Sequence, residues 1–210
     1  MNAAALIFAA GGSSRLHTPK QLVRFRGETL LRHAVRAALS SRCSDVIVVT
    51  GAHGERCAAE VAGMPVTIQH NPRWAEGLSS SIRAGMAVVA ERVLLPDCVV
   101  LLVCDQPGLE PDLINRLLET HLLTGNGIVA SHYAEVLGVP ALFAANYYPA
   151  LTALEGDRGA RQLFQQFADD CGSVAFPAGI RDIDTPADLR FISDSVEYSP
   201  GIAWHSEMPA

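Results

Sequence analysis

Hydrophobic residues in this chain gather in short runs of strand length, separated by stretches with the spacing of helices. The clearest runs cover residues 4–10, 45–51 and 98–104, and each leads to a glycine or an aspartate. Runs this apolar are typical of strands buried on both faces of a sheet. After Thr29, a candidate helix cap, hydrophobic residues recur at helical spacing: Leu30, Leu31, Ala34, Val35, Ala38 and Leu39. The alternation predicts an α/β fold with a mostly parallel sheet covered on both faces.

Weaker patterns complete the prediction. Further helices are expected at 55–62, from 79 through 89, at 111–123, and on either side of the turn 155–159; further strands are expected at 66–69, 127–131 and 138–143. A loop at 182–189 is expected to enter a final capped helix, with Pro186 near its first turn. Residues 1–193 are predicted to form a single domain. The polar segment 194–210 has no periodicity and is expected to be loose or to dock on a partner.

The first candidate binding residues follow the first hydrophobic run. They are Gly11-Gly12-Ser13-Ser14, with Arg15 and Lys20 just after them. Because glycines lack β-carbons, successive backbone N–H groups can converge on an anion, and the serine hydroxyls add donors. The alternative is an ordinary strand-to-helix connection with two surface cations. From the loop alone, both interpretations stay open.

Asp105 directly follows the most hydrophobic run of the chain. Ligands of parallel sheets gather at the carboxyl ends of strands, so the same edge of the sheet is expected to hold both Asp105 and the loop 11–20. A donor-rich loop with cations facing a carboxylate is suited to moving a phosphoryl or nucleotidyl group. In such a site Asp105 would bind Mg²⁺, a cation that prefers oxygen ligands, while Arg15 and Lys20 would neutralise charge on the leaving pyrophosphate.

Composition and charge limit the classes of partner that the protein is expected to bind. The chain has 210 residues and a formal net charge of −6, which argues against a nucleic-acid binder. Seven basic residues and one acidic residue occur through Arg42, and this uneven distribution suits a small polyanion bound in one place. No further apolar run reaches the ~18 residues of a membrane span. The N-terminus lacks the basic segment of a signal peptide and is expected to be mature.

Five scattered cysteines without a C-x-x-C pair predict free thiols and a cytoplasmic protein. The signatures G-x-x-x-x-G-K-[ST], G-x-G-x-x-G, H-E-x-x-H and G-x-S-x-G are absent from the sequence. Classical P-loop, dinucleotide, zinc-protease and serine-hydrolase interpretations therefore lose their main support.

Six ordered motifs resemble the MobA-like nucleotidyltransferases. The segment 9–22 is similar to their A-A-G-x-S-x-R-M-G-x-x-K signature, and the branch most similar to this chain is that of the molybdenum cofactor cytidylyltransferases. The other motifs are N-P-x-W-x-x-G-x-S-S-S at 71–81, C-D-Q-P at 104–107, G-V-P-A-L-F at 138–143, G-D-x-G-A-R at 156–161 and D-I-D-T-P at 182–186. Together they cover roughly residues 4–190.

The resemblance implies a Rossmann-like three-layer α/β/α sandwich with a mostly parallel mixed sheet, of the nucleotide-diphospho-sugar transferase type. It implies a Mg²⁺-dependent reaction of CTP with the phosphate of molybdopterin-bound molybdenum, giving the cytosine dinucleotide cofactor and pyrophosphate. A molybdenum hydroxylase would be the protein that accepts the product. The catalytic residues implied are Arg15, Lys20 and Asp105; the nucleotide contacts are Ala10, Gly11, Gly12, Ser13, Arg15, Lys20, Asn71, Gly77 and Ser81; the metal ligands are Asp105 and Asp184.

Several alternatives stay open. Asp182 could replace Asp184 as the second metal ligand, and either residue could instead cap a helix. The nucleotide could be GTP, although the guanylyl branch usually has A-G-G where this chain has Ala9-Ala10-Gly11. The acceptor could be a sugar or polyol phosphate, or the protein could be a non-catalytic chaperone for the finished cofactor. His17 replaces a glycine of the signature, and Ala134-Glu135 replaces a pair that is often glycine.

Overall fold

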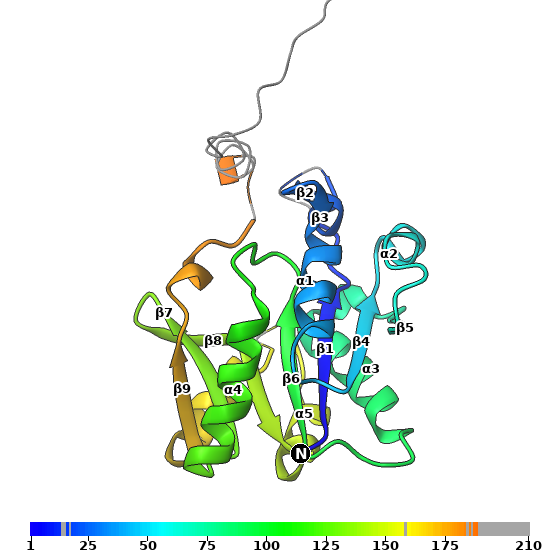
Figure 1. The fold of residues 1–210 in the computed structure, drawn as a ribbon. Coiled ribbons are helices and arrows are strands. Elements are labelled where there is room, and N and C mark those ends of the chain that lie inside the picture. Colours follow the sequence, from blue (N-terminus) through cyan, green and yellow to red (C-terminus); the bar gives the residue numbers. More distant parts are fainter. Residues whose placement is uncertain (14–15, 17, 158, 184, 186, 189–210) are drawn as a thin grey trace, which may run out of the picture.

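The computed structural model describes residues 1–13, 16, 18–157, 159–183, 185 and 187–188. Within this part of the chain, seven strands form one sheet with the order β5-β4-β1-β6-β8-β7-β9 (Figure 1). The strands are β1 (Ala3–Ala9), β4 (Asp45–Thr50), β5 (Thr67–His70), β6 (Cys98–Val103), β7 (Ile128–Tyr133), β8 (Val136–Ala144) and β9 (Cys171–Ala175).

Most neighbouring strands run parallel. β1 lies between β4 and β6 and pairs in parallel with both, and β4–β5 and β7–β9 are parallel as well. β8 runs antiparallel to β6 and β7. The predicted mostly parallel mixed sheet is therefore confirmed, and the carboxyl ends of β1, β4 and β6 meet at one edge.

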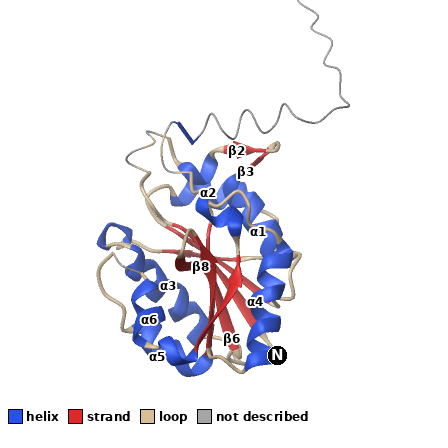
Figure 2. Cartoon of the chain, turned by 90° about the vertical axis from the view of Figure 1, so that its left-hand side faces the viewer, coloured by secondary structure: helices blue, strands red, loops and turns tan. Residues whose placement is uncertain are grey.

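Helices cover both faces of the sheet, which gives three layers (Figure 2). One face carries α1 (Leu30–Leu39), α2 (Gly54–Glu60) and α4 (Pro111–Thr124), and the other carries α3 (Leu78–Ala90), α5 (Tyr148–Thr152) and α6 (Arg161–Gln166). Because strand side chains alternate between faces, Ala5 and Ile7 of β1 enter the first core and Leu6 and Phe8 enter the second. All seven residues of β1 are buried, as its unbroken apolar run predicts.

A local signal accounts for the start of α1. Thr29 caps α1, since its side chain accepts a hydrogen bond of 3.2 Å from the backbone N–H of Arg32. α3 begins at Leu78, one residue before the predicted start, and the serines expected to begin it lie in its first turn. Gly77 occupies the N-cap position at φ 99°, and Ser79–Ser81 are buried in the first turn.

Two features of the fold were not predicted. β9 is an edge strand with a single buried residue, Val174, so it lacks the apolar run that identifies a strand buried on both faces. A short antiparallel pair, β2 (Arg24–Phe25) and β3 (Glu28–Thr29), lies beside the loop that follows β1. The predicted tail, 194–210, lies outside the described residues.

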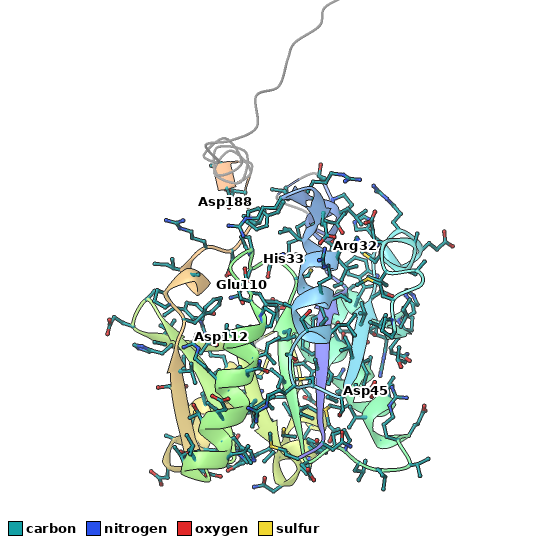
Figure 3. All side chains as sticks on the ribbon, in the orientation of Figure 1. Arg32, His33, Asp45, Glu110, Asp112 and Asp188 are labelled. Atoms are coloured by element: carbon teal, nitrogen blue, oxygen red, sulfur yellow. The ribbon has the colours of Figure 1, made fainter. Side chains whose placement is uncertain are left out.

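Away from the loop-bearing edge, charged groups pair with one another. Asp45 begins β4 near the opposite end of the sheet (Figure 3), where it accepts hydrogen bonds of 2.8 and 3.3 Å from Arg92.

The five cysteines are free thiols, as expected. Among the helices of the described residues, we find none with the length and hydrophobicity of a membrane span.

Candidate functional site

The carboxyl ends of β1 and β6 lie side by side and bring two distant charges together. Phe8 pairs with Val103 at the end of the shared register, and the chain then continues into the loop 11–20 on one strand and into Asp105 on the other. The Lys20 amine forms an ion pair and a hydrogen bond with Asp105 Oδ2. The topological rule thus placed the two residues correctly, on one edge. Incoming phosphates would give Lys20 a new anionic partner and release the carboxylate for a cation.

Gln21 organises the loop from within. Its side chain is only 1% exposed, and its Nε2 donates to the carbonyl oxygens of Ala9 and Gly11 at 3.2 and 2.7 Å. Ser13 Oγ lies 3.4 Å from Gln21 Oε1 and accepts a bond of 2.9 Å from the backbone N–H of Lys20. The sequence analysis gave Gln21 no role, since the one signal for it is its place next to Lys20 in the first motif.

Trp74 packs closely against two glycines, Gly12 of the loop and Gly51 after β4. A β-carbon on Gly12 would lie 3.2 Å from the Trp74 ring, and one on Gly51 would lie 2.6 Å from Trp74 Cβ and 2.5 Å from the Ala10 carbonyl oxygen. At Gly11, by contrast, a β-carbon would meet nothing within 4 Å. The bare backbone of Gly11 therefore faces open space, where a ligand can approach closely.

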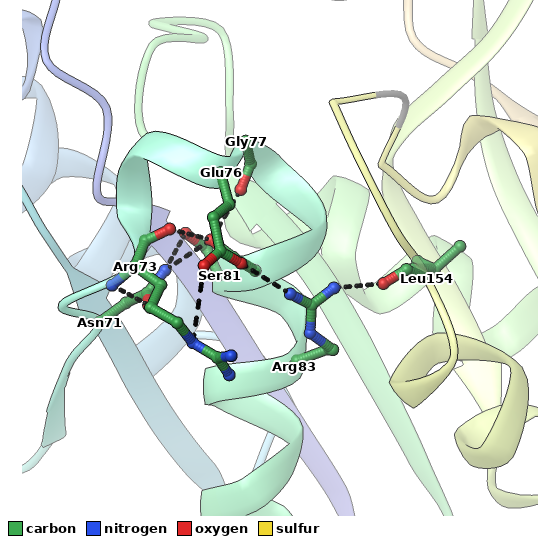
Figure 4. A network of polar contacts seen from close by, with 8 residues as sticks. Asn71, Arg73, Glu76, Gly77, Ser81, Arg83 and Leu154 are labelled. Atoms are coloured by element: carbon green, nitrogen blue, oxygen red, sulfur yellow. Dashed lines mark hydrogen bonds and ion pairs between the residues drawn. The ribbon is translucent and has the colours of Figure 1, made fainter.

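The turn between β5 and α3 is fixed from behind by Asn71. This buried side chain donates from Nδ2 to Ser80 Oγ at 2.8 Å and Ser81 Oγ at 3.1 Å, and its Oδ1 accepts from the Arg73 backbone N–H (Figure 4). Ser80 Oγ in turn lies 2.8 Å from the Gly77 carbonyl oxygen. Asn71, predicted as a nucleotide contact, thus lies behind the wall of the cavity and holds the turn that forms it.

Loop, turn and strand ends enclose a cavity of about 660 Å³, within the range of small-molecule sites. Most of the predicted residues line it: Ala10, Gly11, Gly12, Ser13, Lys20, Gly77, Ser81 and Asp105. Trp74, Glu76 and Asp157 also line it, and the sequence analysis had not placed them there. Arg15, Asp184 and His17 lie outside the described residues.

Asp105 has the features of a metal ligand. Its Oδ1 is buried and finds no hydrogen-bond partner among the residues that the structure describes. An unsatisfied buried carboxylate oxygen is costly, and it is the donor type that Mg²⁺ prefers. Within the described ranges, no three His, Cys, Asp or Glu side chains cluster as a complete metal site. The site fits a cation that takes one or two carboxylates and completes its shell with phosphates and water.

The segment that carries Asp182 passes beside Asp105. The backbone N–H of Ile183 donates to the Asp105 carbonyl oxygen at 3.0 Å. Burial raises the pKa of the Tyr133 hydroxyl, and the neighbouring Asp182 carboxylate raises it further. Thr185 donates to the Asp188 carboxylate from its backbone N–H at 2.7 Å and from its hydroxyl at 2.8 Å. This local pairing resembles one half of a capping box. It is made by Thr185 and Asp188, whereas helix capping had been the open alternative for Asp182.

Cys104 lies next to Asp105 and lines the cavity, and its surroundings favour the protonated thiol. Burial raises the pKa of this thiol well above its ordinary value, and the adjacent Asp105 carboxylate raises it further. Since the thiolate is the nucleophile, a buried protonated cysteine is inert. The cavity therefore offers positioning and electrostatic groups around Lys20 and Asp105.

Comparison with known proteins finds a matching family model and several similar proteins. A profile described as the MobA-like NTP transferase domain matches residues 5–171. Nicotine blue oxidoreductase of Paenarthrobacter nicotinovorans is 31% identical over 170 residues, 77% of this chain and 80% of that protein. Purine catabolism protein PucB of Bacillus subtilis (strain 168) is 29% identical over 202 residues (89% and 94%). Molybdenum cofactor cytidylyltransferase of Escherichia coli (strain K12) is 29% identical over 201 residues (92% and 96%).

Solved structures share the fold. Rv0371c from Mycobacterium tuberculosis H37Rv superposes with a TM-score of 0.79 at 24% identity, covering 92% of this chain and 98% of that one. Its complex with manganese has a TM-score of 0.74, covering 93% and 100% at the same identity. CMP:2-keto-3-deoxy-manno-octonic acid synthetase complexed with CTP has a TM-score of 0.73 at 17% identity, covering 93% and 98%. At these identities the likeness establishes the fold alone.

Proposed function

Because the chain belongs to the MobA-like NTP transferase family, we propose that it transfers CMP from CTP to the phosphate of a molybdenum-bound molybdopterin, with Mg²⁺ as cofactor. The observation that carries the proposal is the Lys20–Asp105 ion pair, set in a nucleotide-sized cavity at the carboxyl ends of β1 and β6. A cation for phosphates and a buried carboxylate for a metal ion are the two groups that this reaction needs.

In the proposed reaction, an oxygen of the acceptor phosphate attacks the α-phosphorus of CTP. A phosphorus–oxygen bond forms there, and the bond from the α-phosphorus to the oxygen bridging to the β-phosphorus breaks, so that pyrophosphate leaves with that electron pair. Lys20 and Arg15 are assigned to the phosphates, where their positive charges stabilise the charge that builds on the leaving group. Asp105, with Asp184 or Asp182, is assigned to Mg²⁺, which would neutralise phosphate oxygens.

Two observations favour CTP and a molybdenum cofactor. Ala10, the position at which the guanylyl branch usually has glycine, is buried and lines the cavity. The cytidylyltransferase of E. coli aligns with 92% of this chain, so the similarity extends beyond the nucleotide loop to the half of the chain that would meet the acceptor. A protein of the same fold has been solved with manganese, which supports a divalent cation in this architecture.

The direct test is to incubate the protein with Mg²⁺, CTP and molybdenum cofactor, and to identify the nucleotide product by mass. Asp105→Asn should lower pyrophosphate release by roughly a hundredfold or more, the scale of losing a main electrostatic group. Asp112→Asn is the matched control, because Asp112 is an exposed residue of α4 paired with Arg116. Substantial activity of folded Asp105→Asn protein would contradict the metal assignment.

The alternatives predict different outcomes. Thermal shifts against four nucleoside triphosphates with Mg²⁺ identify the base, since a ligand at 100 times its Kd stabilises the native state by about 2.7 kcal/mol. A shift with GTP in place of CTP would refute the argument from Ala10. Binding of the finished cofactor without pyrophosphate release would favour a chaperone for a molybdenum hydroxylase. Redox turnover without nucleotide transfer would indicate an activity like the one in the name of the relative called an oxidoreductase.

A further inference from the structure

The two ends of the cavity differ in their charged groups, because Lys20 and Asp105 form an ion pair at one end and two carboxylates line the other. Lys20 and the loop 11–13 lie at the end near β1 and β6, whereas Glu76 and Asp157 line the end formed by the turn before α3. Asp157 comes from the loop between α5 and α6, 79 residues after Leu78 in the sequence. Its Oδ1 accepts a long hydrogen bond of 3.4 Å from the Leu78 backbone N–H.

Close packing fixes the position of Asp157. Gly77 has φ 99°, and a β-carbon there would lie 2.9 Å from both Cα and Oδ1 of Asp157. Two residues further along the loop, a β-carbon on Gly159 would lie 2.7 Å from Leu78 Cδ2. Asp157 and Gly159 therefore rest directly on the first residues of α3 and the glycine before it.

Arg83 ties the same two segments together from below. Its Nη1 donates to the Leu154 carbonyl oxygen, and its Nη2 donates to Glu76 Oε2 at 3.2 Å (Figure 4). Arg73 lies 4.0 Å from the other oxygen of Glu76. The charge of Glu76 is thus balanced by two guanidinium groups, while the exposed Asp157 carboxylate keeps acceptor capacity, because a carboxylate has about four acceptor positions.

Asp105 is paired with Lys20 and is assigned to a metal ion, whereas the contact recorded for Asp157 among the described residues is a backbone N–H. A carboxylate without a cation beside it repels phosphates and suits the uncharged part of the ligand, since like charges repel. The donor groups of that part are the ribose hydroxyls and the exocyclic amine of the base. We infer that Asp157 binds the nucleoside half of the nucleotide by accepting hydrogen bonds from these donors, and so determines which way the nucleotide lies in the cavity. This inference rests on the proposed function, because it requires a nucleoside triphosphate in the cavity.

The test compares wild-type protein with Asp157→Ala and Asp157→Asn, using calorimetric Kd values for CTP, UTP, 2′-deoxy-CTP and inorganic tripolyphosphate with Mg²⁺. The side-chain oxygen of asparagine can still accept the hydrogen bond from the Leu78 backbone N–H, so Asp157→Asn removes the charge and keeps that contact. Asp157→Ala should weaken CTP about tenfold or more, the scale of a hydrogen bond to a charged group. Tripolyphosphate should bind as before or tighter. Asp169→Asn, at an exposed position before β9, should match wild type.

The ligand series separates the two donor sources. If Asp157 meets the exocyclic amine, the wild-type preference for CTP over UTP should disappear in Asp157→Ala; if it meets the ribose, the preference for CTP over 2′-deoxy-CTP should disappear. Wild-type CTP affinity in Asp157→Ala would overturn the inference. So would an equal loss of CTP and tripolyphosphate, which indicates a structural role. Wild-type preference for another nucleotide overturns only the cytidylyl assignment, and wild-type binding of no nucleotide overturns both.

Discussion

Replacing Gln21 tests whether this buried amide holds the loop that is proposed to bind phosphates. Gln21→Met keeps most of the side-chain volume and removes the donor that bonds the carbonyl oxygens of Ala9 and Gly11. Gln21→Glu keeps the shape and replaces that donor with an acceptor. Both variants leave Lys20 and Asp105 in the chain, so any effect on nucleotide binding must come through the geometry of the loop.

The structure sets the size of the effect. Each intramolecular hydrogen bond contributes about 1 kcal/mol net, so Gln21→Met should lower the free energy of unfolding by about 2 kcal/mol. For a protein of this length, that corresponds to a fall in Tm of about 4–8 °C. Gln21→Glu should cost more, because a carboxyl group would face two carbonyl oxygens at a site that is 1% exposed.

Urea unfolding followed by circular dichroism measures the stability, and calorimetry with CTP and Mg²⁺ measures binding. We expect both variants to bind the nucleotide more weakly, even at temperatures where they are fully folded. Gln165→Met is the control, since Gln165 is an exposed residue of α6. Gln21→Met with wild-type stability and wild-type Kd would refute the reasoning, because the loop would then keep its shape without the amide.

Two further predictions concern stability away from the cavity. The Tyr147 hydroxyl and the Gly127 backbone N–H both donate to the Asp170 carboxylate and hold its pKa below the ordinary 3.8. Its stabilising effect is therefore complete above that pH and lost as the pH falls below it. Unfolding between pH 7 and pH 2 should show this loss, and Asp170→Asn should abolish it. Ala134 and Glu135 have φ 48° and 58°, a region that disfavours side chains. Glu135→Gly should thus raise stability by roughly 0.5–1 kcal/mol in urea unfolding; unchanged stability would contradict the strain.

The central strands could be predicted because burial on both faces leaves an unbroken apolar run. β1, β4 and β6 all carry this mark. β9 does not, since an edge strand with one buried residue resembles a loop in sequence. The start of α3 was predicted to within one residue, but Gly77 was not recognised as its N-cap. The serines there are good capping residues, but Asn71 and a glycine at positive φ fix the chain through contacts that a one-dimensional pattern does not contain.

The residues of the candidate site likewise divide into those that could be predicted from the sequence and those that could not. Lys20 and Asp105 followed from a general rule, because parallel neighbours present their carboxyl ends on one edge. The structural function of Gln21 did not follow from this rule, because the sequence alone does not show whether a glutamine is buried or exposed. Asp157 was noticed only as part of a motif, and its place in the cavity depends on how the loop 156–159 packs on α3.

The two halves of the cavity are therefore specified by different kinds of sequence information. At the proposed phosphate end, Gln21 and Ser13 hold the loop through contacts with Gly11 and Lys20, all close in sequence, and Asp105 joins them from the end of β6. The nucleoside end combines the end of β1, the turn before α3 and the loop 156–159, three segments that meet only in the folded protein. Substitutions in that loop can alter which nucleoside fits without moving Lys20 or Asp105. Selectivity among nucleotides can thus change independently of the machinery that holds the triphosphate.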